Sequence, residues 1–152
     1  MSFLAFFDHF FSLGGAKEDD RAAAKKTFTK AIETLNIDVA LAAHENWKYR
    51  LYASLEGNGI DELNPEKIAC DHCCDFGKWI YGDGEEHLGK FAAFTELKAS
   101  HQMFHYTASN VALLVKANKR TEAEELLEGE FARLSHRIES TLKDLKSLSR
   151  TN

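Results

Sequence analysis

The strongest constraint on the fold is a helical periodicity with few interruptions. The 152-residue chain has one proline, Pro65, and its glycines mostly collect at 14–15, 57–59 and 82–84. These are the residue types that most often end helices, so their clustering predicts long helices joined by short loops. No alternating run of β-branched residues is long enough to predict a strand. The sequence therefore predicts an all-α fold around one core.

Apolar residues at three- and four-residue steps predict two helices in the first half of the chain. The first runs from about residue 17 to 55, with room for a break near Asn36. The second begins at Asn64, a good N-cap followed by Pro65 at the first helical position, and stops at Gly82. This second helix would carry all three cysteines of the chain.

Two more helices are predicted in the second half, each from a capping box. The boxes are Asp83 with Glu86 and Thr121 with Glu124. Together the predictions give an antiparallel four-helix bundle with an extra N-terminal helical segment. The expected inward stripes are Phe91, Phe94, His101, His105, Ala108, Ala112 and Val115 on the third helix and Leu127, Phe131, Leu134, Ile138, Leu142 and Leu145 on the fourth.

The predicted domain organisation is an apolar N-terminal arm, residues 1–16, followed by a helical bundle over 17–150. The arm lacks a cationic n-region, and Asp8 and His9 interrupt it well short of a membrane-spanning length. We therefore expect neither a signal peptide nor a transmembrane segment. Packing of the arm on its own bundle or on a dimer partner is favoured over a membrane contact.

Charge and cysteine content narrow the functional class. The net charge is −5 and basic residues are scattered among acidic ones, so nucleic acid is not expected as a partner. Cys70, Cys73 and Cys74 crowd into five residues, too close to join distant segments, and their odd number cannot pair fully within one chain. A reducing, cytoplasmic environment fits this pattern best.

Four side chains form a candidate metal site. His101 and His105 are four residues apart on one predicted helix face, while His44 and Cys74 lie on the first and second predicted helices. Thiolate and imidazole together suit Zn²⁺, and three histidines with one cysteine fill a tetrahedron without a vacancy. This donor set indicates a structural or sensing site, and the chain is not expected to be an enzyme.

An alternative interpretation is that the histidines are hydrogen-bonded core residues, which is the commoner role of one histidine on an apolar stripe. Two neutral histidines without partners would, however, place unsatisfied polar atoms in the core. A metal ion satisfies one nitrogen of each ring and leaves the other for a neighbouring acceptor. The residues alone leave both interpretations open.

Three short motifs carry a family resemblance: His-Glu-Asn-Trp at 44–47, Cys-Asp-Phe-Gly-Lys-Trp at 74–79 and His-Gln-Met-Phe-His at 101–105. In order and spacing they resemble the chemoreceptor zinc-binding domain, a bacterial sensory module. Its pattern is His-x-Trp/Phe or a close variant, Cys-x-apolar-Gly-x-Trp and His-x3-His. The resemblance covers about residues 36–148.

The resemblance implies zinc ligands at His44, Cys74, His101 and His105, in a helical bundle that is commonly a homodimer. It also implies a sensory role in which a stand-alone member signals in trans to a chemoreceptor or a diguanylate cyclase. Such a module would change its bundle or dimer conformation on zinc binding. Such a member could instead buffer zinc without a partner, and the sequence does not separate the two roles.

The chain departs from the family pattern in two places. The aromatic Trp47 stands third after His44, one position later than a strict match. Cys70, His72 and Cys73 are additions with no counterpart in the pattern. On a helix the extra cysteines would share a face with Cys74; packing in a seam is favoured for them over an accessory redox role. Gly77 and Trp79 are expected to serve a close helix crossing and an apolar cover.

Two further functions compete with zinc sensing. Oxidation of a zinc-bound Cys74 thiolate would weaken its bond to the metal, which would make the chain an oxidant sensor. A haemerythrin-like di-iron protein is the other alternative, although such bundles use more histidines together with bridging carboxylates.

Overall fold

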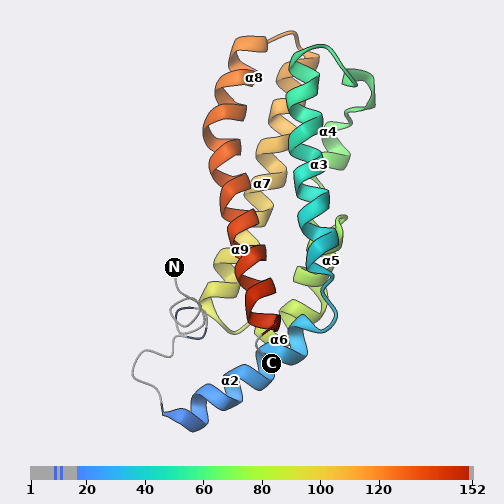
Figure 1. Cartoon of the computed structure of the whole chain (residues 1–152). Coiled ribbons are helices and arrows are strands. Elements are labelled where there is room, and N and C mark those ends of the chain that lie inside the picture. Colours follow the sequence, from blue (N-terminus) through green and yellow to red (C-terminus); the bar gives the residue numbers. More distant parts are fainter. Residues whose placement is uncertain (1–8, 10, 12–16, 151–152) are drawn as a thin grey trace.

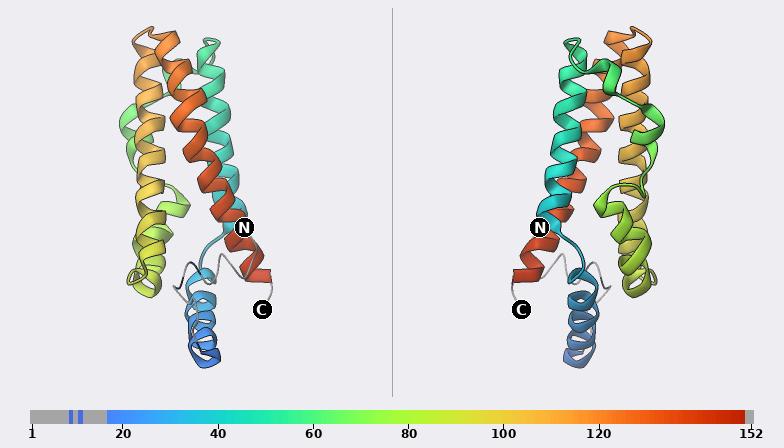
Figure 2. Two further views of the ribbon diagram at one scale, coloured as in Figure 1. Left: turned by 90° about the vertical axis from the view of Figure 1, so that its left-hand side faces the viewer. Right: turned by 90° about the vertical axis from the view of Figure 1, so that its right-hand side faces the viewer.

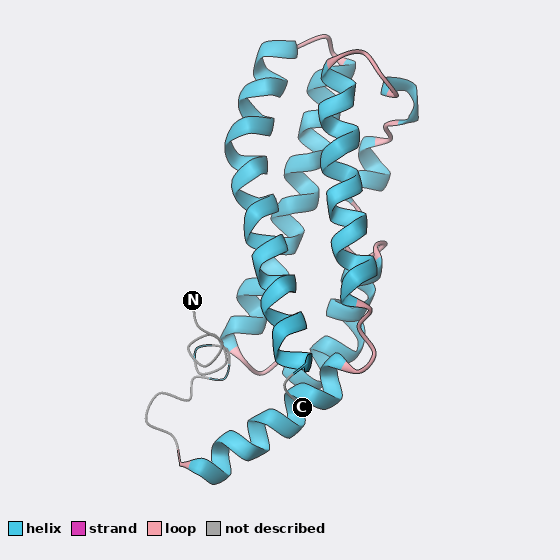
Figure 3. Ribbon diagram, viewed as in Figure 1, coloured by secondary structure: helices cyan, strands magenta, loops and turns pink. Residues whose placement is uncertain are grey.

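In the computed structural model, the described residues 9, 11 and 17–150 form helices and turns without a β-strand (Figure 3). The expected all-α class is confirmed. None of the helices in these residues is long and apolar enough to cross a membrane. In chain order the elements are α2 (Glu18–Ile32), α3 (Ile37–Leu55), η1 (Ile60–Glu62), α4 (Pro65–Ala69), α5 (Asp75–Trp79), η2 (Ile80–Gly84), α6 (Glu85–Leu88), α7 (Ala92–Lys116), α8 (Arg120–Leu126), η3 (Leu127–Phe131) and α9 (Ala132–Arg150).

Three long rods lie side by side: α3, α7, and the run from α8 through η3 to α9 (Figure 1). The first two run in one direction and the third in the other. The predicted break near Asn36 is confirmed, because Asn36 caps α3 by accepting the Val39 N–H at 3.1 Å. Every residue of the inward stripe predicted for the last helix is buried, and the core lies between the rods.

The single helix predicted from Asn64 to Gly82 is wrong. Its start is as expected, since Asn64 caps α4 by accepting the N–H groups of Glu66 and Lys67, but α4 ends at Ala69. A turn over residues 70–74 follows before α5 begins. Short helices thus lie along α7 where a fourth long helix was expected (Figure 2), and the three cysteines do not share a helical face.

The predicted capping boxes of the third and fourth helices are also wrong. Asp83 lies inside η2, and α7 begins only after its N-cap Phe91. At α8 the N-cap is Lys119, one residue before the helix starts, and its side chain makes no capping bond. The stripe predicted for α7 is nonetheless buried from Phe94 onward, so the face that the sequence assigns to the core is correct.

Helix α2 packs below the rods and closes one end of the core (Figure 2). The Trp79 indole N–H donates to the Ala31 carbonyl at 2.8 Å and so fastens α2 to α5. Of the apolar arm, the described residues include only His9 and Phe11. Phe11 is buried against Phe28 and Phe91, with ring centroids 6.0 and 4.7 Å away, so this part of the arm packs on its own chain.

Candidate metal centre

The four predicted ligands come together in the structure. His44 lies midway along α3, Cys74 is the N-cap of α5, and His101 and His105 lie one turn apart on α7. One donor atom from each, taken together, all lie within 4.8 Å of one another. We call these four residues the metal group. The three histidines are buried, with 2%, 0% and 4% of their surface exposed, and Cys74 is half-buried.

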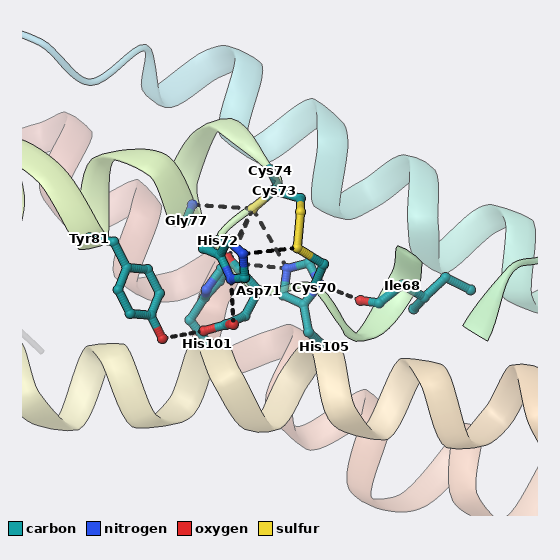
Figure 4. A network of polar contacts seen from close by, with 10 residues as sticks. All are labelled: Ile68, Cys70, Asp71, His72, Cys73, Cys74, Gly77, Tyr81, His101 and His105. Atoms are coloured by element: carbon teal, nitrogen blue, oxygen red, sulfur yellow. Dashed lines mark hydrogen bonds and ion pairs between the residues drawn. A yellow bond between two sulfur atoms is a disulfide. The ribbon is translucent and has the colours of Figure 1, made fainter. Parts of the chain in front are cut away.

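The distances within the metal group match those of a tetrahedral site. Cys74 Sγ lies 3.4 Å from His101 Nε2 and 3.6 Å from His105 Nε2, and the two Nε2 atoms are 3.2 Å apart (Figure 4). Ideal zinc–ligand bonds at tetrahedral angles place sulfur and nitrogen about 3.6 Å apart, and two nitrogens about 3.3 Å apart. The residues present therefore fit a Zn²⁺ ion.

Hydrogen bonds orient two of the rings. His44 Nδ1 donates to the Ala40 carbonyl at 2.7 Å, and His105 Nδ1 donates to the Ile68 carbonyl at 2.7 Å. With Nδ1 protonated, each neutral ring keeps an Nε2 lone pair, the form that binds a metal. His44 Nε2 and His101 Nδ1 are buried without a hydrogen-bond partner. A cation between the donors would satisfy His44 Nε2, the orphaned atom that faces the group.

Burial keeps these histidines neutral. Loss of hydration on burial lowers the pKa of His44 to about 4. Burial, together with the neighbouring rings of His105 and His44, lowers the pKa of His101 to about 2. The pKa of His105 is lowered as well, again mainly by burial. Burial also raises the pKa of the Cys74 thiol. The three imidazoles are therefore uncharged, which is the form that binds a metal ion. The Cys74 thiol must first lose its proton, and a divalent cation nearby promotes that loss.

The backbone around Cys74 aims its sulfur at the histidines. Because Cys74 precedes α5, its Sγ accepts the Gly77 N–H at 3.2 Å instead of pointing along a helix. Gly77 lies against the preceding turn: a Cβ there would be 1.8 Å from the Asp71 carbonyl oxygen. The close approach predicted for glycine is present, but its partner is this turn and not a crossing helix.

Aromatic rings close the site from the α5 side. The ring of Phe76, fully buried, meets His101 edge-on with centroids 5.1 Å apart and also faces His44 at 5.9 Å. Trp79 stacks on Phe76 at 6.0 Å, so its apolar surface lies one layer behind the site. The predicted covering role of Trp79 is therefore indirect, since Phe76 makes the contact with the histidines.

The structure also contains a second cluster of cysteine and histidine side chains, which the sequence did not predict as a group. Cys70 and Cys73 form a disulfide in the turn before Cys74, and His72 Nε2 lies 3.5 Å from Cys70 Sγ. We call Cys70, His72 and Cys73 the surface cluster. Cys73 and His72 are exposed, so the packed seam favoured for the extra cysteines is wrong. The Cys-x-x-Cys spacing of Cys70 and Cys73 is the sequence signal from which this group could have been predicted.

Comparison with known families agrees with this geometry. The model of the chemoreceptor zinc-binding domain matches residues 44–112, a stretch that begins at His44 and includes the whole metal group. Over residues 44–112 the chain is similar to that family. The match runs from the middle of α3 to near the end of α7, a shorter stretch than residues 36–148. No curated protein and no solved structure matched the chain.

Proposed function

We propose that the chain is a zinc-binding regulatory module whose metal group, His44, Cys74, His101 and His105, holds one ion. The observation that carries the proposal is the convergence of three imidazoles and one sulfur, from three helices, onto one point inside the core. A tetrahedral set of this composition is typical of zinc. The match to a zinc-binding family supports the same assignment.

The regulatory part of the proposal follows from where the ligands lie. Binding draws α3, α7 and the start of α5 to one centre, so it favours the conformation in which all four donors are in range. A bound ion shifts a conformational balance only by its differential affinity for the two states. We propose that this shift alters the bundle or a homodimer of it and is passed in trans to a cytoplasmic partner such as a diguanylate cyclase or a chemoreceptor.

The donor set argues against two other functions. Four protein ligands would fill the zinc sphere, whereas catalytic zinc usually keeps one position for water or substrate. A di-iron centre of the haemerythrin kind uses bridging carboxylates, and the metal group contains none. A role in binding and regulation is therefore favoured over catalysis or oxygen carriage.

Elemental analysis of protein purified without added metal tests zinc binding. We expect about one zinc per chain in the natural protein and almost none in His101→Ala, because loss of one tetrahedral ligand severely weakens binding. His136→Ala is the matched control, since His136 is exposed on α9 and outside the metal group. Equal zinc content in both variants would contradict the assignment of the ligands.

Regulation requires its own test. Sedimentation of the full chain with zinc and after chelation measures whether the metal changes a monomer–dimer balance, and hydrogen exchange reports whether α3 and α7 open when it is removed. Purification of partners in the two states then asks whether one associates in a zinc-dependent way. If mass, exchange and partners are all unchanged, the chain binds zinc without regulating anything.

Oxidant sensing by Cys74 is a second candidate function, because Cys74 is a free thiol and only half-buried. Oxidation of the bound thiolate would remove one ligand and release the ion. Stepwise addition of peroxide to the zinc-loaded protein should then release zinc in proportion to Cys74 oxidation. Release that proceeds equally from Cys74→Ser, loaded with zinc to the same level, would exclude Cys74 as the sensor.

A further inference from the structure

The disulfide of the surface cluster lies directly before a ligand of the metal group. Cys70 is the C-cap of α4, Cys73 lies in the turn that follows, and their Cα atoms are 5.4 Å apart. Figure 4 shows the disulfide in the turn, beside Cys74. Cys73 is exposed and Cys70 is half-buried, so solvent reaches this bond.

This disulfide is poorly suited to a purely stabilising role. It links residues three apart in the sequence, and a cross-link that closes so short a loop restricts the unfolded chain far less than one joining distant segments. The turn is also closed without it, because the Cys73 N–H donates to the Cys70 carbonyl at 3.2 Å. An exposed bond that joins no separate elements is instead accessible to exchange with other thiols.

We propose that Cys70 and Cys73 form a reversible thiol–disulfide exchange site that controls how readily the metal group releases zinc. The second half of this statement rests on the proposed zinc-binding function. The reaction partner is a thiol reductant, either a small thiol or a protein dithiol, and the oxidised reductant is its disulfide.

The exchange proceeds in two balanced steps. A reductant thiolate attacks the exposed Cys73 Sγ, the Cys70–Cys73 bond breaks, and Cys70 leaves as a thiolate next to His72 Nε2, 3.5 Å away, which can donate a hydrogen bond to it. A second reductant thiolate attacks the reductant sulfur of the mixed disulfide and frees Cys73. Two electrons pass to the chain, both thiolates take up a proton from solvent, and the reductant leaves as a disulfide.

Contacts on both sides of the turn connect it to the metal group. The Asp71 carbonyl packs on Gly77 and lies 3.9 Å from Cys74 Sγ. The Ile68 carbonyl, just before the turn, accepts the bond that orients His105. The segment therefore supports two of the four donors, and a change in its covalent constraint alters how firmly they are held.

Reduction should favour release for two reasons. It removes the cross-link from the turn that positions Cys74. It also frees the donor atoms of Cys70, His72 and Cys73, which lie within 4.8 Å of one another and adjoin Cys74 in the sequence. Thiolate and imidazole are ligands that suit zinc, so the reduced cluster would offer alternative donors beside Cys74. In the oxidised form the two sulfurs are bonded to each other and would not serve as thiolate donors.

The first arm of the test measures exchange. The full chain is equilibrated in glutathione buffers of graded ratio, quenched in acid, alkylated and mapped by mass spectrometry. We expect Cys70 and Cys73 to pass together from disulfide to dithiol in one two-electron transition, both in the natural chain and in Cys74→Ser. A pair that stays wholly oxidised or wholly reduced in every buffer overturns the proposal.

The second arm follows zinc release to a chromogenic chelator from oxidised and from phosphine-reduced protein, after removal of the reductant. Release from the reduced form is expected to be faster by on the order of tenfold, a typical size for coupled sites. Cys70→Ala/Cys73→Ala should release zinc at one rate after either treatment. Equal rates from the two forms of the natural chain overturn the proposal and leave zinc binding intact, whereas zinc absent from both forms overturns the proposed function.

Discussion

The metal group and the surface cluster use the same kinds of side chain, yet their surroundings differ. In the metal group the imidazoles are almost fully buried, and His44 Nε2 has no hydrogen-bond partner among the residues that the structure describes. In the surface cluster His72 and Cys73 are exposed, and the sulfurs are already bonded to each other. Burial creates a need for a cation in the first case, while exposure allows reaction with solvent thiols in the second. Residue type alone would not separate the two.

The two groups also differ in how the chain builds them. The metal group draws on α3, α5 and α7, so it exists only when those helices are packed. The surface cluster lies within one turn, and its residues are neighbours even in an unfolded chain. Metal binding should therefore contribute to folding, whereas the redox state of the cluster should affect it little.

Zinc removal gives the largest expected effect. With free zinc a thousandfold above its dissociation constant, chelation should lower the free energy of unfolding by about 4 kcal/mol. Urea unfolding with and without chelator measures this difference. Cys70→Ala/Cys73→Ala should show a similar drop when free zinc is again a thousandfold above that variant's own dissociation constant, because the surface cluster supplies none of the four ligands. If chelation lowered the free energy of unfolding only in the natural chain, the metal group and the surface cluster would not be separate sites.

Acid should destabilise the metal-free protein next most strongly. The folded pKa of His44, about 4, and of His101, about 2, lie below the unfolded value of 6.5. The unfolded chain therefore binds more protons as pH falls below 6.5, so stability is full above that pH and declines toward these folded values. At pH 5 the loss should be on the order of 2 kcal/mol for each histidine.

Thermal unfolding of metal-free protein between pH 7.5 and 5 checks this dependence. His44→Phe should flatten it, because the aromatic ring cannot bind a proton. His136→Phe should leave it unchanged, since His136 is exposed. Identical profiles for the two variants would show that burial of the metal group is not the cause.

Gly77→Ala should act on the contact that joins the two groups. Its methyl group would meet the Asp71 carbonyl oxygen at 1.8 Å, so the turn must move. We expect a loss of about 2 kcal/mol in stability, as for other overpacked sites, together with weaker zinc binding. Gly129→Ala is the control, because nothing lies within 4 Å of its added Cβ. Unfolding and zinc competition should both separate the variants; retention of zinc affinity in Gly77→Ala would mean that the turn does not position Cys74.

The sequence could predict the metal group because helical periodicity is a local property. His101 and His105 share one face of any helix, and a stripe of apolar neighbours places that face in the core. The same reasoning turned His44 inward. Apolar residue type alone does not place a side chain in the core, since Val39 on the same helix is 43% exposed.

The turn over residues 70–74 could not be predicted in this way. Nothing as strong as proline or glycine marks its start, and the caps at Asn64 and Gly82 fit one continuous helix equally well. Its cause is tertiary, since the turn packs on Gly77 and lets Cys74 cap α5 with its sulfur toward α7. The disulfide could not be predicted either, because the expected helix places the cysteines along one face and the expected compartment is reducing.

Tyr81→Phe should have the smallest effect on stability. It tests whether the contact between Tyr81 and Asp71 holds the surface cluster in place. The Tyr81 hydroxyl donates to Asp71 Oδ2 at 2.6 Å, an interaction that raises the pKa of Tyr81 to about 12. Because Tyr81 is 41% exposed, its loss should cost about 1 kcal/mol or less in urea unfolding. Reduction of the disulfide by glutathione should nevertheless become faster, since the turn that carries it loses an anchor. Tyr49→Phe, at a site 73% exposed, should change neither quantity, and equal behaviour of the two variants would mean that Asp71 does not hold the surface cluster in place.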